Sequence, residues 1–305
     1  MQAKRVILTL AVILALSCAV LGVILAGIVR VGSTLPDSAV KDLVKTLGES
    51  GILVDASLVS GRRETASVYV MDSADYAPTV ASLLSGSAPA KVYAVPDGEI
   101  FLMENGARVD FLAGFSFRYS ADGEPVDTLH TVEQPSPSDA LNAARQERVG
   151  RIVSAFLDAG SRSFTEAEGR NVDVRCVTDA VWTADGTEYA LCSRTIDGIR
   201  ITANRVICAL DGDRVAEAWG VWYFLTPAES YSAQLTDRMN ILFNMKKQVG
   251  QADPPVTVES VSLCYSLRFL AEGEGFCLIP CWQVTTDGMG RFLFNALDGA
   301  FYTIN

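Results

Sequence analysis

Residues 6–29 read VILTLAVILALSCAVLGVILAGIV, a run of 24 residues without a charged side chain. As an α-helix with a rise of about 1.5 Å per residue, this run covers about 36 Å, whereas the hydrocarbon core of a bilayer is about 30 Å thick. Lys4 and Arg5 precede the run, and Arg30 follows it. Because basic residues favour the cytoplasmic side, the sequence predicts a single-pass cell-membrane protein with a cytoplasmic N-terminus and an extracytoplasmic remainder.

Two alternatives exist for this stretch. A secretory signal peptide has a shorter apolar region of about 7–15 residues and then a small-residue cleavage site, for which residues 31–33 are a weak match. A lipoprotein would use Cys18, but eleven apolar residues follow it, where a lipidated chain turns polar. The length of the run favours the membrane anchor over both alternatives.

Small side chains recur along one face of the predicted anchor at spacings of three and four residues: Ala11, Ala15, Ala19, Gly22 and Ala26. Such a stripe lets a second helix approach closely within a membrane. Small residues are also frequent in membrane helices in general, which is a second explanation for the stripe. The sequence predicts these five residues as the contact with a partner helix.

The chain beyond the anchor is acidic. Residues 31–305 contain 22 basic and 36 acidic residues, a net charge of −14. Such a surface repels nucleic acid, so a nucleic-acid partner is not expected. The whole chain is 49% hydrophobic and 20% charged, which is typical of a folded protein rather than a disordered or fibrous one.

The periodicity of apolar residues predicts an α+β fold with two extracytoplasmic domains of antiparallel sheet and packed helices. The first domain, residues 33–120, is expected to contain two helices and five strands, at 33–51, 75–86, 63–72, 91–95, 99–103, 107–111 and 115–119. Residues 121–137 form a proline-containing linker after it, and residues 1–32 are the cytoplasmic stub and the anchor.

The second predicted domain, residues 138–305, repeats a helix followed by four strands. Turn signals separate the strands, above all the Asp-Gly pairs at 185–186, 197–198, 211–212 and 298–299. Thr226-Pro227-Ala228-Glu229 has the residues of a helix start and predicts a second helix through Tyr231 to Val249. The expected elements are helices at 136–160 and 226–249 and strands at 172–182, 187–194, 199–210, 214–225, 256–270, 276–286, 291–296 and 300–304.

No catalytic or metal-binding motif is evident. Six cysteines outside the anchor permit up to three disulfides in fifteen pairings, but each lies in an apolar run that equally suits buried thiols: Cys176, Cys192, Cys208, Cys264, Cys277 and Cys281. The single histidine, His130, lies in the predicted linker. Without G-x-S-x-G, P-loop or H-E-x-x-H patterns, the sequence predicts neither an enzyme nor a cofactor. The sequence leaves open whether two carboxylates face one another across a cleft, as they do in glycosidases.

The C-terminal half resembles the C-terminal domain of the YycI and YycH regulators, membrane-anchored extracytoplasmic proteins of Gram-positive bacteria. Three segments carry the resemblance, and Arg200 stands where the family usually has proline: Gly198-Ile199-Arg200-Ile201, Pro280-Cys281-Trp282-Gln283-Val284, and Phe294-Asn295-Ala296 with Gly299. The closing hairpin also resembles PepSY-type modules. For the residues themselves, the direct explanation of Trp282 and Pro280 is strand packing and shape.

The resemblance implies a regulator of a WalK-type sensor histidine kinase, in a two-component system that controls the cell wall, acting together with a paralogous membrane-anchored regulator. The small-residue stripe of the anchor is compatible with that role, because a helix contact can bias a partner between two arrangements. The alternative is a PepSY-like binding module that restrains a protease or holds a cell-wall ligand.

Overall fold

The computed structural model describes residues 37–59, 64–71, 77–126, 143–159, 164–165, 171–224, 227–269 and 275–304. These residues form a mixed α+β fold dominated by antiparallel sheet, with four α-helices among them. The predicted α+β class is confirmed at this level. The chain divides into two compact units: unit 1 from Met1–Ala66, Ala233–Ser262 and Cys281–Asn305, and unit 2 from Ser67–Ser232 and Leu263–Pro280.

These units differ from the predicted domains 33–120 and 138–305. The first described residues belong to unit 1 together with C-terminal segments, because strand β1 (Ile52–Val54) pairs in parallel with β14 (Val256–Phe269). A strand of three residues is too short for its periodicity to be read from sequence. Residues 127–137 of the predicted linker, including His130, lie outside the described residues.

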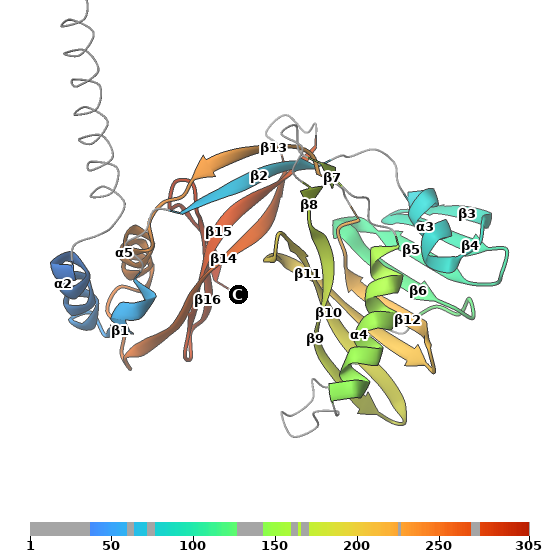
Figure 1. Cartoon of the computed structure of the whole chain (residues 1–305), viewed down its shortest axis with the longest axis horizontal. Coiled ribbons are helices and arrows are strands. Elements are labelled where there is room, and N and C mark those ends of the chain that lie inside the picture. Colours follow the sequence, from blue (N-terminus) through green and yellow to red (C-terminus); the bar gives the residue numbers. More distant parts are fainter. Residues whose placement is uncertain are drawn as a thin grey trace, which may run out of the picture. The chain divides into compact units, whose positions relative to one another are not determined.

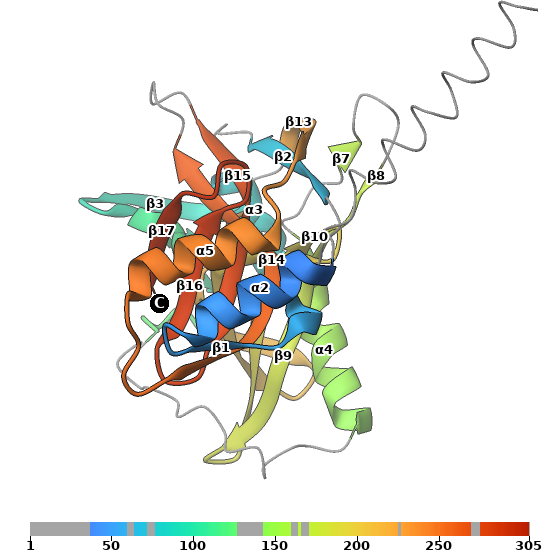
Figure 2. The ribbon, with the colours of Figure 1, turned by 90° about the vertical axis from the view of Figure 1, so that its left-hand side faces the viewer.

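Unit 1 is a sheet covered by two helices. Along the sheet the strands follow the order β1, β14, β15, β16 and β17. Figure 2 shows α2 and α5 side by side over this sheet. The boundary between the units falls within β15, after Pro280. The further elements that lie wholly or partly in unit 1 have these bounds: α2 Asp37–Gly48, α5 Arg238–Val249, β15 Phe276–Thr286, β16 Gly290–Asn295 and β17 Phe301–Ile304.

The core of unit 1 is built from the apolar faces of both helices and one face of the sheet. Leu43 and Leu47 of α2 are 1% and 0% exposed, and they are four residues apart, as one helix face requires. The other fully or nearly fully buried side chains of this unit include Ile52, Ile241, Leu242, Met245, Trp282, Val284, Phe292 and Phe294. Helix α2 is therefore an integral part of the core.

The predicted helix start at Thr226-Glu229 is wrong. Residues Pro227–Gln234 form strand β13, which pairs with β2 (Thr65–Met71), and Tyr231 is 57% exposed. Helix α5 begins only at Arg238, where the Asp237 side chain accepts a hydrogen bond from the Asn240 backbone N–H at 2.9 Å. Residues 226–229 and the segment that begins at Asp237 both contain side chains that can cap a helix. At residues 227–234, pairing with β2 prevents a helix from forming.

The main sheet of unit 2 has eight antiparallel strands in the order β9, β10, β11, β12, β6, β5, β4, β3. The four-stranded meander and the four strands after α4 were both predicted, and both are confirmed. Their bounds are β3 Pro89–Val95, β4 Gly98–Met103, β5 Arg108–Leu112, β6 Ser116–Ser120, β9 Val174–Ala184, β10 Thr187–Ile196, β11 Ile199–Asp211 and β12 Arg214–Val221.

Two helices cover this sheet. Helix α3 (Ala77–Ser85) packs on β3, β4 and β5, and α4 (Ala143–Asp158) packs on β9, β10 and β12 (Figure 1). Their buried side chains join one core cluster with the strands, including Val80, Leu84, Val149, Val153 and Leu157. The short elements are β7 Phe164–Thr165, β8 Asn171–Val172 and two 3₁₀ turns, Ala56–Leu58 and Ala113–Phe115.

Truncating a core leucine of α2 tests whether this helix belongs to unit 1. Leu47→Ala is expected to lower the free energy of unfolding by about 2–5 kcal/mol, the usual cost of a cavity left by a buried leucine. Leu53→Ala, at a side chain that is 49% exposed, is the matched control and should change stability by less than about 0.5 kcal/mol. Urea unfolding of the full chain measures both, and equal effects would contradict the packing of α2.

Candidate functional site

The five residues predicted to contact a partner helix, Ala11, Ala15, Ala19, Gly22 and Ala26, lie outside the described residues. Within the part of the chain that the structure describes, none of the helices has the length and apolarity needed to cross a membrane. The anchor and its stripe therefore stay predictions.

The tryptophan of the closing hairpin has a defined structural role in unit 1. Trp282 in β15 is paired with Phe294 in β16, and its indole N–H donates to the Thr236 carbonyl oxygen at 2.8 Å. The Arg238 guanidinium lies over the indole ring, 4.9 Å from its centroid. Trp282 thus fixes the start of α5 against the sheet through a hydrogen bond and a cation–π contact.

The next two residues of the motif shape the final turn. The Asn295 side chain accepts from the Leu297 N–H at 2.9 Å, and the Gly299 N–H donates to the Asn295 carbonyl at 2.8 Å. Gly299 has φ +74°, and a Cβ there would lie 2.9 Å from Asn244 Nδ2, which donates to the Gly299 carbonyl at 2.9 Å. The positive φ favours glycine here, because a side chain would strain the backbone.

Unit 2 holds the remaining motif residues. Gly198, with φ +76°, follows Asp197 in the turn between β10 and β11, and Ile201 is paired with Tyr265 of β14. Pro280 is a buried residue of β15. The six motif residues are therefore divided equally between the two units: Gly198, Ile201 and Pro280 in unit 2, and Trp282, Asn295 and Gly299 in unit 1.

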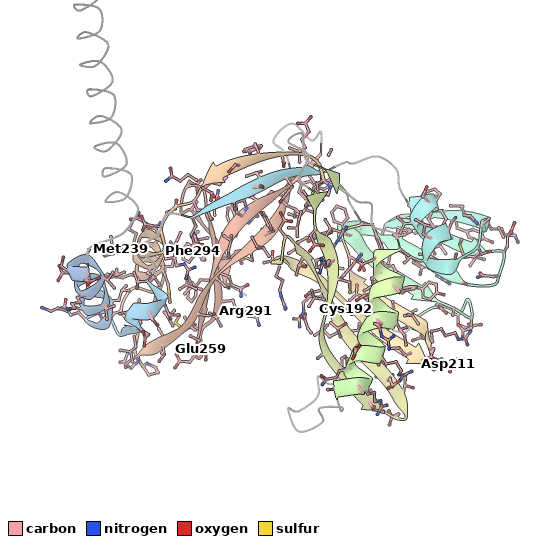
Figure 3. The ribbon with its side chains drawn as sticks, in the orientation of Figure 1. Cys192, Asp211, Met239, Glu259, Arg291 and Phe294 are labelled. Carbon is pink, nitrogen blue, oxygen red and sulfur yellow. The ribbon has the colours of Figure 1, made fainter. Side chains whose placement is uncertain are left out.

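Unit 2 also has a polar cavity of about 590 Å³ beside the β11–β12 turn, near Asp211 in Figure 3. We call it the acidic pocket. Its charged lining residues are Asp122, Glu188, Asp211, Arg214 and Glu217. Arg214 Nη2 donates to Asp211 at 2.7 Å, so these two charges offset one another. The carboxylates outnumber the guanidinium group, which makes the pocket suitable for a cationic group.

Two glutamates of the acidic pocket have opposite pKa shifts. Burial acts to raise the pKa of Glu188, but hydrogen bonds and charges from Arg145 and Arg148 outweigh it and lower that pKa. At Glu217, burial and then the nearby Asp122 charge raise the pKa. Two carboxyl groups whose pKa values are shifted in opposite directions can act as a base and an acid. Glu188 is already held by two guanidinium groups, so its main role is structural.

The cysteines of β9, β10 and β11 form a row beneath α4. Cys192 lies diagonally across from Cys176 on one side, and from Cys208 on the other; Figure 3 shows Cys192 at the strand behind α4. A hydrogen bond with Cys192 and then burial raise the pKa of Cys176. The hydrogen bond with Cys176 favours the Cys192 thiolate, but the Cys208 contact and burial outweigh it and raise that pKa.

The raised pKa keeps the thiols of Cys176 and Cys192 protonated near neutral pH, which makes them poor nucleophiles and poor metal ligands. All six described cysteines are buried and none is joined in a disulfide, so the structure has thiols where the sequence left the pairing open. Among the described residues, no group of three or more His, Cys, Asp or Glu side chains is arranged to hold a metal ion.

Comparisons with known proteins add little. No family model and no curated protein matches the sequence. Among solved structures, the fold is similar to that of an uncharacterized protein from Eubacterium rectale ATCC 33656. The two share 12% sequence identity at a TM-score of 0.47, over 83% of this chain and 90% of the other.

The opposite pKa shifts predict opposite effects of neutralising the two glutamates. Glu217→Gln is expected to raise the free energy of unfolding at pH 7, because the folded protein disfavours the charged carboxylate there. The gain should shrink as the pH falls and vanish below about pH 4, where the carboxyl is protonated in both states.

Glu188→Gln is the matched variant with the reverse sign. It should lower stability at pH 7, because the lowered pKa of Glu188 stabilises the fold above the unfolded pKa, and the difference from the wild type should disappear as the pH falls through the folded pKa. Thermal unfolding from pH 3 to pH 8 measures both variants. A shift of the same sign at pH 7 would contradict the assigned environments.

Proposed function

We propose that this protein is a non-catalytic, single-pass membrane protein whose extracytoplasmic body regulates a partner in the same membrane. On the resemblance to the YycI and YycH regulators, the partner is a sensor histidine kinase of a cell-wall two-component system, and residues 6–29 are the anchor. One observation carries the proposal. The first described helix after the anchor segment, α2, has its leucines fully buried in unit 1.

This packing supports a mechanical link between the anchor and the body. Only seven residues separate residue 29 from Asp37, where α2 begins. Lys246 of α5 donates to the Thr46 carbonyl of α2 at 3.4 Å, and Leu43 and Leu47 are buried. Because packed cores shift as rigid bodies rather than deform continuously, a displacement of the anchor would act directly on unit 1.

The acidic pocket favours a second candidate function. A cavity of about 590 Å³ has the size of a small-ligand site, and its carboxylates suit a cationic group. This supports a PepSY-like module that holds a cell-wall ligand. Under this alternative, substitutions in the pocket would change the activity of the protein, whereas substitutions in the anchor would not.

Substitutions in the anchor test the partner contact. Ala15→Leu with Gly22→Ile is expected to abolish recovery of the sensor kinase with this protein from detergent-solubilised host membranes, because larger side chains keep a second helix at a distance. Ser17→Leu places a similar bulk on the opposite face of the predicted helix and should leave recovery unchanged. Equal recovery of the kinase with all variants would refute the predicted contact.

A flexible insertion tests the link through α2. Six Gly and Ser residues between Gly32 and Ser33 should leave kinase recovery intact and remove the effect of this protein on kinase autophosphorylation in reconstituted membranes, because such a linker transmits no displacement. The same insertion in the exposed turn at Asp185 is the control and should preserve the effect. Full regulation by the first variant, or by a chain lacking residues 1–30, would contradict the proposal.

A further inference from the structure

Strand β3 is one end of the main sheet of unit 2. Among the described residues it pairs with β4 alone, and Figure 1 shows it at the outer edge of the sheet. The backbone N–H and C=O groups on its outer side are therefore a template for a further strand. Their alternation specifies a β-strand as the structure that would cover this edge.

The two ends of this sheet differ in their protection against such pairing. Proteins usually protect an end strand with charges, a proline, a bulge or a short length. Strand β9, at the other end, contains Arg175 and Asp179, each held in an ion pair. Strand β3 has seven residues with one charge, Lys91, and its proline and its irregular pairing are confined to the start, between Pro89 and Lys91. From Lys91 to Val95 it pairs with β4 without interruption, so these five residues form a regular, unprotected edge.

Apolar side chains are exposed around this edge. Leu83, Val92 and Tyr93 are 50%, 52% and 47% exposed, and Leu83 belongs to α3, which packs on β3. They are three of the eight large hydrophobic side chains that are exposed in the part of the chain that the structure describes. Exposed apolar side chains that gather in one region are typical of an interaction surface.

The distribution of charge favours a second copy of this chain as the molecule that covers the edge. Residues 31–305 carry a net charge of −14, so two copies repel one another over most of their surface. Residues 77–96 contain no carboxylate and one charged residue, Lys91, although 20% of the whole chain is charged. Two copies can therefore approach at this segment without like-charge contact. A basic partner would instead be attracted to regions where carboxylates gather.

We propose that β3 pairs with β3 of a second copy, antiparallel about a two-fold axis at Tyr93, so that one sheet continues through both molecules. This register uses all five residues of the regular edge and sets Lys91 opposite Val95 of the partner subunit. It keeps the two lysines at opposite ends of the paired strands. An axis at Lys91 would set the two lysines directly opposite one another, which is unfavourable.

The same register brings opposite charges together at both ends of the contact. Lys91 comes diagonally next to Asp97 of the partner subunit, within reach of a long side chain. Both residues are exposed, and the Asp97 carbonyl oxygen accepts from the Ala113 N–H at 2.6 Å, which holds this turn in place. Because both copies use the same strand, the pairing closes at two copies. Five paired residues per copy make a small interface and therefore a weak, reversible dimer.

This inference concerns unit 2 alone, and it does not depend on a regulatory role for the protein or on the identity of a membrane partner.

Cysteine cross-linking of the full chain in detergent tests the register. Tyr93→Cys places a thiol directly opposite its own copy, at a Cα separation of about 4.5–5.5 Å that suits a disulfide, so oxidation with diamide should join the chains into covalent dimers. Tyr231→Cys is the matched control, at an exposed tyrosine of another edge strand, β13, and should cross-link several-fold less. The wild type sets the background from the native cysteines, six of which are buried.

Charge exchange tests the two ion pairs. Lys91→Glu should raise the Kd of the dimer about tenfold, because one substitution removes both symmetric pairs, and Asp97→Lys should act in the same direction. The chain with both substitutions restores the pairs with exchanged signs, so its Kd should return to within about twofold of the wild-type value. Sedimentation equilibrium in detergent measures all four proteins, and circular dichroism checks that they fold.

Three outcomes would overturn the inference. One is cross-linking of Tyr93→Cys that does not exceed that of Tyr231→Cys. Another is a wild-type chain that sediments as a monomer at every concentration. The third is a dimer whose Kd is unchanged by Lys91→Glu, or is not recovered in the double variant, since association would then occur through another surface.

Discussion

The parallel pairing of β1 with β14 is the constraint on which unit 1 depends. Ile52 lies beside Val256, and Val54 beside Val258, so about two hundred residues of sequence separate the partners. Three of these side chains, Ile52, Val256 and Val258, are at most 6% exposed. The pairing brings α2 onto the same sheet as α5. Without it, helix α2 would have no core to enter.

Much of the secondary structure could be predicted because turn-forming residue pairs separate the strands in the sequence. Asp185-Gly186 and Asp197-Gly198 each separate two strands, and Asp185 and Asp197 adopt positive φ there, as such hairpin turns require. At 226–229, local cap chemistry predicted a helix, yet the segment forms the edge strand β13. Pairing with β2 is a distant contact that no local pattern reports.

The sites were less predictable than the fold. The sequence identified Trp282 and Gly299 through a resemblance, and the structure shows that both shape the closing hairpin and its contact with α5. It did not identify the cavity of unit 2 that Phe111, Phe115, Trp222, Phe224, Phe269 and Phe276 line, because these residues lie far apart in sequence. The density of aromatic residues at 219–224 was the one local signal. The contribution of Phe115 depends on a backbone conformation that sequence does not encode in a recognisable form.

The row of free thiols at Cys176, Cys192 and Cys208 has a consequence for the maturation of the protein. An unfolded chain exposes all six cysteines of this region to any oxidant, and thiol–disulfide exchange can then join pairs that the finished sheet keeps apart. Closing the sheet beneath α4 takes the sulfur atoms of Cys176, Cys192 and Cys208 out of reach. In an oxidising medium, the yield of correctly folded protein therefore depends on whether the strands assemble before disulfides form. A reductant that is present until the sheet has closed would favour the native form.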